Sequence, residues 1–225
     1  TVEANKVITD IIARGKFPIL VGGTGLYIKA LIDGIETLSV PPDEKLRERL
    51  ENKSAEELFK MLCKLNMEVA DSLNFSDKKN KRRLIRKIEI AKYSRPYTIN
   101  RYIDISDILM VGITAPREVL YELIDKRVYR RMEEGMVEET QGLLKIGVPH
   151  ERLQSLGLEY KYIDDYLTRK LTRDEMAKAL KFAIHAFARR QMTWFKRDAR
   201  IRWFDIMDSG LQEKVEGLVR KWYNR

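Results

Sequence analysis

The pattern of apolar and polar positions predicts a strand placed between two helices at the start of the chain. Apolar residues recur with helical spacing over residues 2–14, and a short apolar run at residues 17–21 suits a strand buried on both faces. The glycine-rich residues 22–25 break this pattern before helical spacing returns at residues 26–31. The order of strand, glycine-rich turn and helix is typical of α/β proteins with a parallel sheet.

The same alternation returns in the second half of the chain. A second apolar run covers residues 105–113, and Pro116 then suits the start of a helix that continues through Met132. Residues 201–204 form a third strand candidate before a final helix. We therefore expect an α/β fold in which helices flank a parallel sheet.

The region between these units has a different character. Residues 43–100 are rich in charge, carry no strand signal and contain the capping box Ser54-Ala55-Glu56-Glu57. We therefore interpret this region as a helical insertion domain. The expected organisation is a core α/β segment at residues 1–42, the insertion at residues 43–100, and core α/β structure with C-terminal helices at residues 101–225.

A long helix that Thr172 caps has two faces of opposite chemistry at 100° per residue. One stripe carries Lys178, Lys181, His185, Arg189 and Lys196, and the far side carries Leu180, Ala183, Ile184, Phe187 and Trp194. A charged stripe on a core helix is usually only solvated, so this pattern alone does not indicate a ligand.

A second basic region covers residues 78–95, which contain nine Lys and Arg residues and the single acid Glu89. Read as one helix, this region places Lys78, Arg82, Arg86 and Tyr93 on one face and Leu84, Ile88 and Ala91 on the other. A cationic face with an aromatic side chain suits phosphate backbones and base stacking. A solvated face is the alternative, although the charge imbalance exceeds what solubility requires.

Composition narrows the class of partner. The chain carries 43 Lys and Arg against 34 Asp and Glu, for a net charge of +9, which suits a polyanionic partner.

The single cysteine, Cys63, excludes an internal disulfide and lies among apolar residues, so we expect it to pack in a core without a catalytic role. No apolar run has membrane-spanning length, so we expect a soluble, cytoplasmic protein without membrane contact.

The turn Gly22-Gly23-Thr24-Gly25 is a candidate anion site. Its backbone N–H groups and the Thr24 hydroxyl could bind an anion at the start of a helix. A simple tight turn is the alternative, and the sequence is not a Walker A motif because no Gly-Lys-Ser/Thr follows.

Arg127 is a second candidate. The helical period places it on an arc with Leu120, Leu123, Ile124 and Arg131. On an apolar arc it must extend toward solvent, pair with Asp125 or Glu133, or bind an anion such as a diphosphate. His150 and His185 are too isolated for a catalytic triad or a zinc site, and no metal-ligating cluster is evident.

Several motifs together resemble the tRNA dimethylallyltransferase family, also called tRNA isopentenylpyrophosphate transferase. They occur in family order at residues 18–27, 82–89, 116–128, 153–157 and 189–194. The resemblance implies a fold similar to P-loop kinases with a helical insertion. It also implies transfer of a dimethylallyl group from dimethylallyl diphosphate to the exocyclic amine of an adenosine beside the anticodon.

The resemblance further implies roles for individual residues. Thr24 and Arg127 are the expected catalytic residues, and they bind the diphosphate together with Gly22 and Gly23. The residues that match tRNA-contacting positions are Arg47, Arg82, Arg83, Leu84, Ile85, Arg86, Gln154, Ser155, Leu156, Gly157, Leu158, Glu159, Arg189, Arg190, Gln191, Met192, Thr193, Trp194, Phe195 and Lys196. Mg²⁺ is the implied cofactor, the anticodon stem-loop of tRNA is the implied partner, and we expect a monomer.

Two departures from the family pattern bear on activity. The phosphate-binding loop and the Asp-Ser-x-Gln segment, whose Asp is the family's general base, do not occur in this sequence, which begins at Thr1 without Met. We interpret the chain as lacking an N-terminal segment that would hold the Mg²⁺ ligands. The sequence Gly157-Leu158-Glu159-Tyr160 also replaces the family's more usual Gly-Tyr-Lys. The alternatives are an adenylate dimethylallyltransferase or nucleotide kinase of the same fold, and a noncatalytic RNA-binding module.

Overall fold

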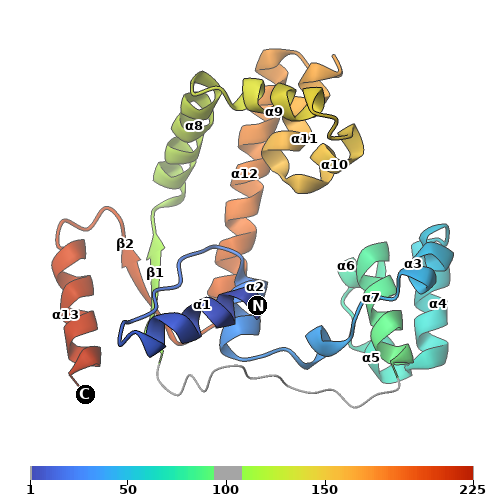
Figure 1. Cartoon of the computed structure of the whole chain (residues 1–225), viewed down its shortest axis with the longest axis horizontal. Helices are drawn as coiled ribbons and strands as arrows, with labels where there is room; N and C mark the ends of the chain where they lie inside the picture. Colours follow the sequence, from blue (N-terminus) through green and yellow to red (C-terminus); the bar gives the residue numbers. More distant parts are fainter. Residues whose placement is uncertain (1, 94–107, 225) are drawn as a thin grey trace. The chain divides into compact units, whose positions relative to one another are not determined.

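The computed structural model describes residues 2–93 and 108–224, which belong to two compact units, Thr1–Ile105 and Ser106–Arg225 (Figure 1). In the first unit, the elements are α1 (Val2–Ala13), α2 (Gly25–Ile32), the 3-10 helix η1 (Glu36–Ser39), α3 (Glu44–Glu51), α4 (Ala55–Leu65), α5 (Met67–Asp71), α6 (Phe75–Lys78) and α7 (Lys81–Lys92). In the second, they are β1 (Met110–Thr114), α8 (Arg117–Glu133), α9 (Met136–Lys145), α10 (His150–Leu156), α11 (Leu158–Leu167), α12 (Arg173–Phe195), β2 (Ile201–Asp205) and α13 (Leu211–Tyr223).

The apolar run at residues 17–21 does not form the expected buried strand. These residues have no regular secondary structure, and Ile19 and Val21 are 85% and 88% exposed. A strand requires a neighbour that accepts and donates its backbone hydrogen bonds, and the sheet found in the described part of the chain, β1 with β2, does not include residues 17–21. The helices on either side, α1 and α2, form as expected.

Helices α3 to α7 pack around one apolar core in the first unit. Leu58 and Leu62 of α4 lie against Leu84 and Ile88 of α7, and all four are fully buried. Cys63 packs against this core from a partly buried position, as expected. The described elements between residues 43 and 93 are all helical, as predicted, whereas residues 94–100 of the predicted insertion lie outside the described residues.

Short polar side chains start all five of these helices. Asp43, Asn66, Asn74 and Asn80 each accept a hydrogen bond from a backbone N–H of the following turn, and Ser54 and Glu57 form the predicted reciprocal capping box. Such caps bind N–H groups that have no partner within the helix and are each worth about 1 kcal/mol. Asn80 thereby fixes the point at which α7 begins.

The second unit contains the predicted parallel sheet. Strands β1 and β2 pair in parallel, with Met110 opposite Ile201 and Thr114 opposite Asp205, and α13 packs beside β2. Gly112 lies opposite Trp203, whose ring would be 2.6 Å from a Cβ at position 112. A glycine is therefore required for the close approach of the Trp203 side chain. Residues 105–107 of the predicted first strand lie outside the described residues.

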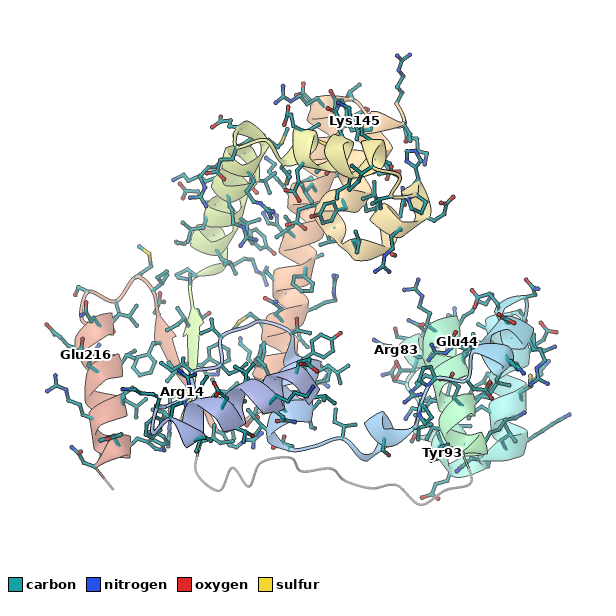
Figure 2. The ribbon with its side chains drawn as sticks, in the orientation of Figure 1. Arg14, Glu44, Arg83, Tyr93, Lys145 and Glu216 are labelled. Carbon is teal, nitrogen blue, oxygen red and sulfur yellow. The ribbon has the colours of Figure 1, made fainter. Side chains whose placement is uncertain are left out.

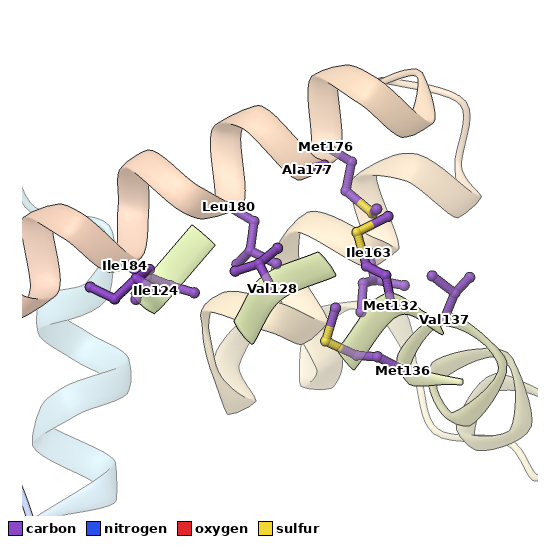
Figure 3. Close-up of a cluster of buried hydrophobic side chains, with 10 residues drawn as sticks. All are labelled: Ile124, Val128, Met132, Met136, Val137, Ile163, Met176, Ala177, Leu180 and Ile184. Atoms are coloured by element: carbon purple, nitrogen blue, oxygen red, sulfur yellow. The ribbon is translucent and has the colours of Figure 1, made fainter. Parts of the chain in front are cut away.

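Helices α8, α9, α11 and α12 build the apolar core of the second unit (Figure 3). Ile124 and Val128 of α8 face Leu180 and Ile184 of α12, while Ile163 of α11 is completely buried among them. The predicted cap of α12 is present, because Thr172 and Glu175 form a second capping box. These contacts hold α8 and α12 side by side over several turns.

Candidate functional site

The turn at residues 22–25 leads directly into α2 in the first unit. Thr24 is exposed and occupies the N-cap position, but its hydroxyl makes no capping hydrogen bond to the helix. Its backbone carbonyl accepts from the N–H groups of Tyr27 and Ile28, at 3.0 and 3.2 Å. A hydroxyl that is not used as a cap is available to an anion near the positive end of the α2 dipole.

Arg127 lies in the second unit, on the exposed side of α8. The prediction that it lies on an apolar arc is therefore wrong. The buried stripe of α8 is formed by Ile124, Val128 and Met132, because this is the face that α12 covers. Leu123 is also exposed. The helical period thus predicted an apolar arc on α8 that differs from the stripe that is actually buried.

The cations around Arg127 have carboxylate partners. Lys126 pairs with Glu122, Arg130 with Glu134, and Arg131 with Glu159 at 2.9 Å. Neither Asp125 nor Glu133 pairs with Arg127, and no other ion pair to it forms in residues 2–93 and 108–224. Its guanidinium is consequently the one in this part of α8 that a ligand can bind without displacing a carboxylate.

The basic region of the first unit is divided between two helices. Asn80 starts α7, so Lys78 belongs to α6 and does not share the predicted helical face. Arg82 and Arg83 are exposed at the beginning of α7, whereas Tyr93 lies at its opposite end, as Figure 2 shows for Arg83 and Tyr93. The aromatic side chain expected beside these arginines is therefore not Tyr93.

Two of the expected RNA contacts in α7 are part of the protein core. The side chains of Leu84 and Ile85 are 0% and 6% exposed and pack against α4 and its neighbours. A side chain buried in this way has no surface for a nucleic acid, so direct side-chain contact by these two residues is excluded. Their role is to hold α7 against the rest of the unit.

A buried carboxylate organises the arginines that remain. Glu89 is 3% exposed and accepts hydrogen bonds from the Arg47 guanidinium at 2.7 and 3.1 Å, from Arg86 at 3.1 Å and from the Asp43 backbone N–H at 3.0 Å. Burial alone would raise the pKa of Glu89, but these hydrogen bonds outweigh burial and lower the pKa. Arg86 also donates to the carbonyl oxygens of Thr37 and Val40. These contacts of Arg47, Arg86 and Glu89 hold residues 37–47, which lead into α3, against α7.

The predicted contact region at residues 154–159 covers the end of α10, Gly157 and the beginning of α11. Gln154 donates to Asp164 at 2.7 Å and to Asp165 at 3.1 Å, and His150 Nδ1 donates to the buried Asp164 carboxylate. Burial would raise the pKa of Asp164, but the hydrogen bonds from Gln154 and His150 lower it. Of the predicted residues, Ser155 and Leu156 are exposed, while Gly157, Leu158 and Glu159 are partly buried. The Asp164 network therefore holds the end of α10, which carries the exposed Ser155 and Leu156, against α11.

The end of α12 is more exposed than its helical wheel suggests. Phe187 and Trp194, expected on the apolar side, are 42% and 41% exposed, because the core that covers α12 ends near Ile184. Arg189, Arg190, Thr193 and Lys196 are exposed, and Gln191, Met192 and Phe195 are partly buried. Polar and aromatic side chains thus share the last three turns of this helix.

His185 was expected on the cationic stripe of α12 and is instead buried. Its ring stacks on Tyr121 of α8 with centroids 3.9 Å apart, and its Nε2 lies 2.8 Å from the Asp125 carboxylate. Lys181 also contacts Asp125, at 3.2 Å, and Arg189 donates to the Tyr121 hydroxyl at 2.6 Å. No local sequence pattern predicts this cluster, because His185 of α12 and Asp125 of α8 are 60 residues apart in the sequence.

Neither a metal site nor a membrane span is found in the described residues. No group of three or more His, Cys, Asp or Glu side chains there could hold a metal ion, and no step is assigned to the implied Mg²⁺. None of the helices in this part of the chain combines the length and apolarity needed to cross a membrane.

Comparison with known proteins identifies clear relatives. The family model described as "IPP transferase" matches residues 1–198, a range that contains each predicted site residue. The chain is 41% identical over 221 residues to tRNA dimethylallyltransferase 1 of Parabacteroides distasonis, covering 96% of this chain and 70% of the relative. It is 42% identical over 206 residues to tRNA dimethylallyltransferase 2 of Treponema denticola, covering 87% and 66% of the two chains.

Two solved structures are similar to this chain. The full-length tRNA isopentenylpyrophosphate transferase from Bacillus halodurans matches with a TM-score of 0.63 and 32% identity, over 98% of this chain and 72% of that one. The tRNA delta(2)-isopentenylpyrophosphate transferase from Staphylococcus epidermidis matches with a TM-score of 0.62 and 27% identity, over 99% and 74% of the chains.

Proposed function

This chain belongs to the IPP transferase family, and from that premise we propose that it transfers a dimethylallyl group from dimethylallyl diphosphate to the exocyclic amine of an adenosine beside the anticodon of tRNA. The observation that carries the proposal is the family match over residues 1–198, because it includes the Thr24 turn, Arg127 and the basic surfaces in one alignment. Relatives about 40% identical to this chain bear the corresponding enzyme name.

In the proposed reaction, the adenine amine attacks the allylic carbon of the donor. The bond between this carbon and the bridging oxygen breaks, the electron pair leaves with diphosphate, and the amine loses one proton to a general base that we assign to no residue of this chain. Negative charge grows on the bridging oxygen. Groups that bind this charge more strongly in the transition state than in the substrate increase the rate.

Arg127 and the Thr24 turn are the groups that we assign to the diphosphate. Arg127 has a planar guanidinium suited to two phosphate oxygens and no carboxylate partner in the described part of the chain. Thr24 offers a hydroxyl that does not cap α2, and the backbone N–H groups of Gly22 and Gly23 precede it. These features support the assignment of both segments to the leaving group.

The remaining predicted contacts suit the RNA. Arg82, Arg83, Ser155, Arg189, Arg190 and Lys196 are exposed, and phosphate contacts by such side chains supply affinity that depends on salt concentration. An adenine must leave its stack before its amine can meet an allylic carbon in an enclosed site. Such contacts would hold the RNA while the base is extruded.

Acceptor choice tests the proposal. The full-length protein should be incubated with dimethylallyl diphosphate and with either an anticodon stem-loop or AMP, and the products analysed by mass spectrometry. We expect one dimethylallyl group on an adenosine of the stem-loop and none on AMP. Transfer to AMP would indicate an adenylate dimethylallyltransferase, and RNA binding without any transfer would indicate a noncatalytic module. Either result would reject the proposal.

A further inference from the structure

The basic surface of the first unit contains an exposed aromatic side chain. Phe75, the first residue of α6, is 73% exposed. It lines an open hollow of about 660 Å³ together with Ser76, Lys79, Asn80, Lys81 and Arg82.

The cations around Phe75 are not neutralised by acids. Lys79 Nζ lies 4.2 Å from the centre of the Phe75 ring, and neither Lys79 nor Arg82 forms an ion pair with a carboxylate in residues 2–93 and 108–224. Two nearby acids have other partners: Asp77 pairs with Arg83, and Glu89 binds the guanidinium groups of Arg47 and Arg86. The hollow is therefore an aromatic site with a local excess of positive charge.

We propose that this hollow binds an unpaired nucleotide of the substrate RNA, whose base stacks on Phe75 and whose phosphate is bound by Lys79 and Arg82. Stacking on an aromatic side chain requires an accessible base face, which a single-stranded loop offers and a continuous duplex does not. A phenylalanine ring has no hydrogen-bonding group, so the site binds a stacked base without distinguishing one base from another. The inference rests on the proposed function, because it takes RNA as the substrate.

The charge pattern favours a nucleotide over an acidic peptide. An acidic peptide would need only the cations, whereas the exposed ring beside them matches a ligand that combines a phosphate with a flat apolar face. The capping side chain of Asn80 also holds the N-terminus of α7 and thus fixes Lys81 and Arg82 at the edge of the hollow. The site is therefore built on a defined helix start.

The test is binding of a fluorescent anticodon stem-loop to the full-length protein, measured by anisotropy over a range of salt concentrations. Phe75→Leu should weaken binding by roughly tenfold, the loss expected for one stacked base, while the slope of log Kd against log salt stays unchanged. Phe75→Tyr should bind like the wild type. Arg82→Gln should reduce the salt slope by nearly one, because it removes a phosphate contact.

Two controls make the result specific to stacking. Tyr223→Leu removes another exposed aromatic residue, at the end of α13 beside Lys221 and Arg220, and should leave binding unchanged. A fully paired duplex of the same length should bind Phe75→Leu and wild type equally. Urea unfolding of each variant checks that the fold is intact.

Equal binding of the stem-loop by Phe75→Leu and wild type would overturn the inference, as would an equal loss in Phe75→Leu and Phe75→Tyr. Polyglutamate that displaces the stem-loop as efficiently as unlabelled RNA would also overturn it. The proposed function fails in a different way: the wild-type protein would then transfer no dimethylallyl group to the stem-loop. Transfer by the wild type without any effect of Phe75→Leu would reject the inference alone.

Discussion

The guanidinium of Arg47 donates two hydrogen bonds, at 2.7 and 3.1 Å, to the buried carboxylate of Glu89, 42 residues further along the chain. The pair joins α3 to α7, the last described helix of the first unit. Arg47 was expected to contact tRNA, and that expectation stays a prediction. Its contact with Glu89 shows in addition a structural role that is independent of any RNA.

Glu89→Gln should destabilise the protein by about 2 kcal/mol, because it leaves two guanidinium groups at a partly buried site without their shared counterion. The measurement is urea unfolding, in which the midpoint should fall while the slope stays constant. Glu48→Gln is the control, since Glu48 is exposed on the same helix as Arg47 and its replacement should change stability by less than about 0.5 kcal/mol. Equal midpoints for the two variants would show that the network does not stabilise the fold.

The lowered pKa values of Glu89 and Asp164 predict a pH dependence of stability. At pH values between the folded and unfolded pKa, the unfolded chain binds more protons, so the free energy of unfolding rises with pH there. The contribution is complete above the unfolded pKa of about 4 and is lost as pH falls through the lower folded pKa. Unfolding free energy measured from pH 6 downward should therefore fall less steeply for Glu89→Gln than for the wild type. Parallel curves would contradict this role of Glu89.

Thr24 and Thr172 both occupy N-cap positions, but only Thr172 uses its side chain as a cap. Thr24→Ala should leave the midpoint of thermal unfolding unchanged and lower the turnover of dimethylallyl transfer by about tenfold, because the lost hydroxyl serves the diphosphate. Thr172→Ala should show the opposite pattern, with a stability loss of about 1 kcal/mol and normal turnover. A destabilised Thr24→Ala variant with normal turnover would indicate that the hydroxyl has only a structural role.

Local sequence signals predicted much of the fold. Local patterns predicted the capping box at Ser54, the cap of α12 at Thr172 and the strand at residues 201–204, and each is confirmed. The apolar run at residues 105–113 also forms a strand where it is described, from Met110 onward. Asn80 is a local signal that could have separated α6 from α7, because Asn is a favoured N-cap residue.

Long-range packing explains the positions that the sequence did not predict. Which face of α8 is buried depends on where α12 lies, so Arg127 proved to be exposed rather than on an apolar arc. His185 is buried only because Tyr121 and Asp125 of α8 cover it. Phe75 was missed as a candidate because a single apolar residue in a charged segment has no pattern that separates an exposed side chain from a core side chain.

In the proposed function, Arg127 stabilises the leaving diphosphate and the basic surfaces bind the RNA. The most direct test is Arg127→Gln in the full-length protein, with kcat measured at saturating donor and stem-loop and with Kd for the stem-loop measured separately. Arg130→Gln is the matched control, because Arg130 lies on the same helix but pairs with Glu134. We expect a loss in kcat of about a hundredfold or more for Arg127→Gln alone, with Kd near the wild-type value. A normal kcat together with a weakened Kd would contradict it.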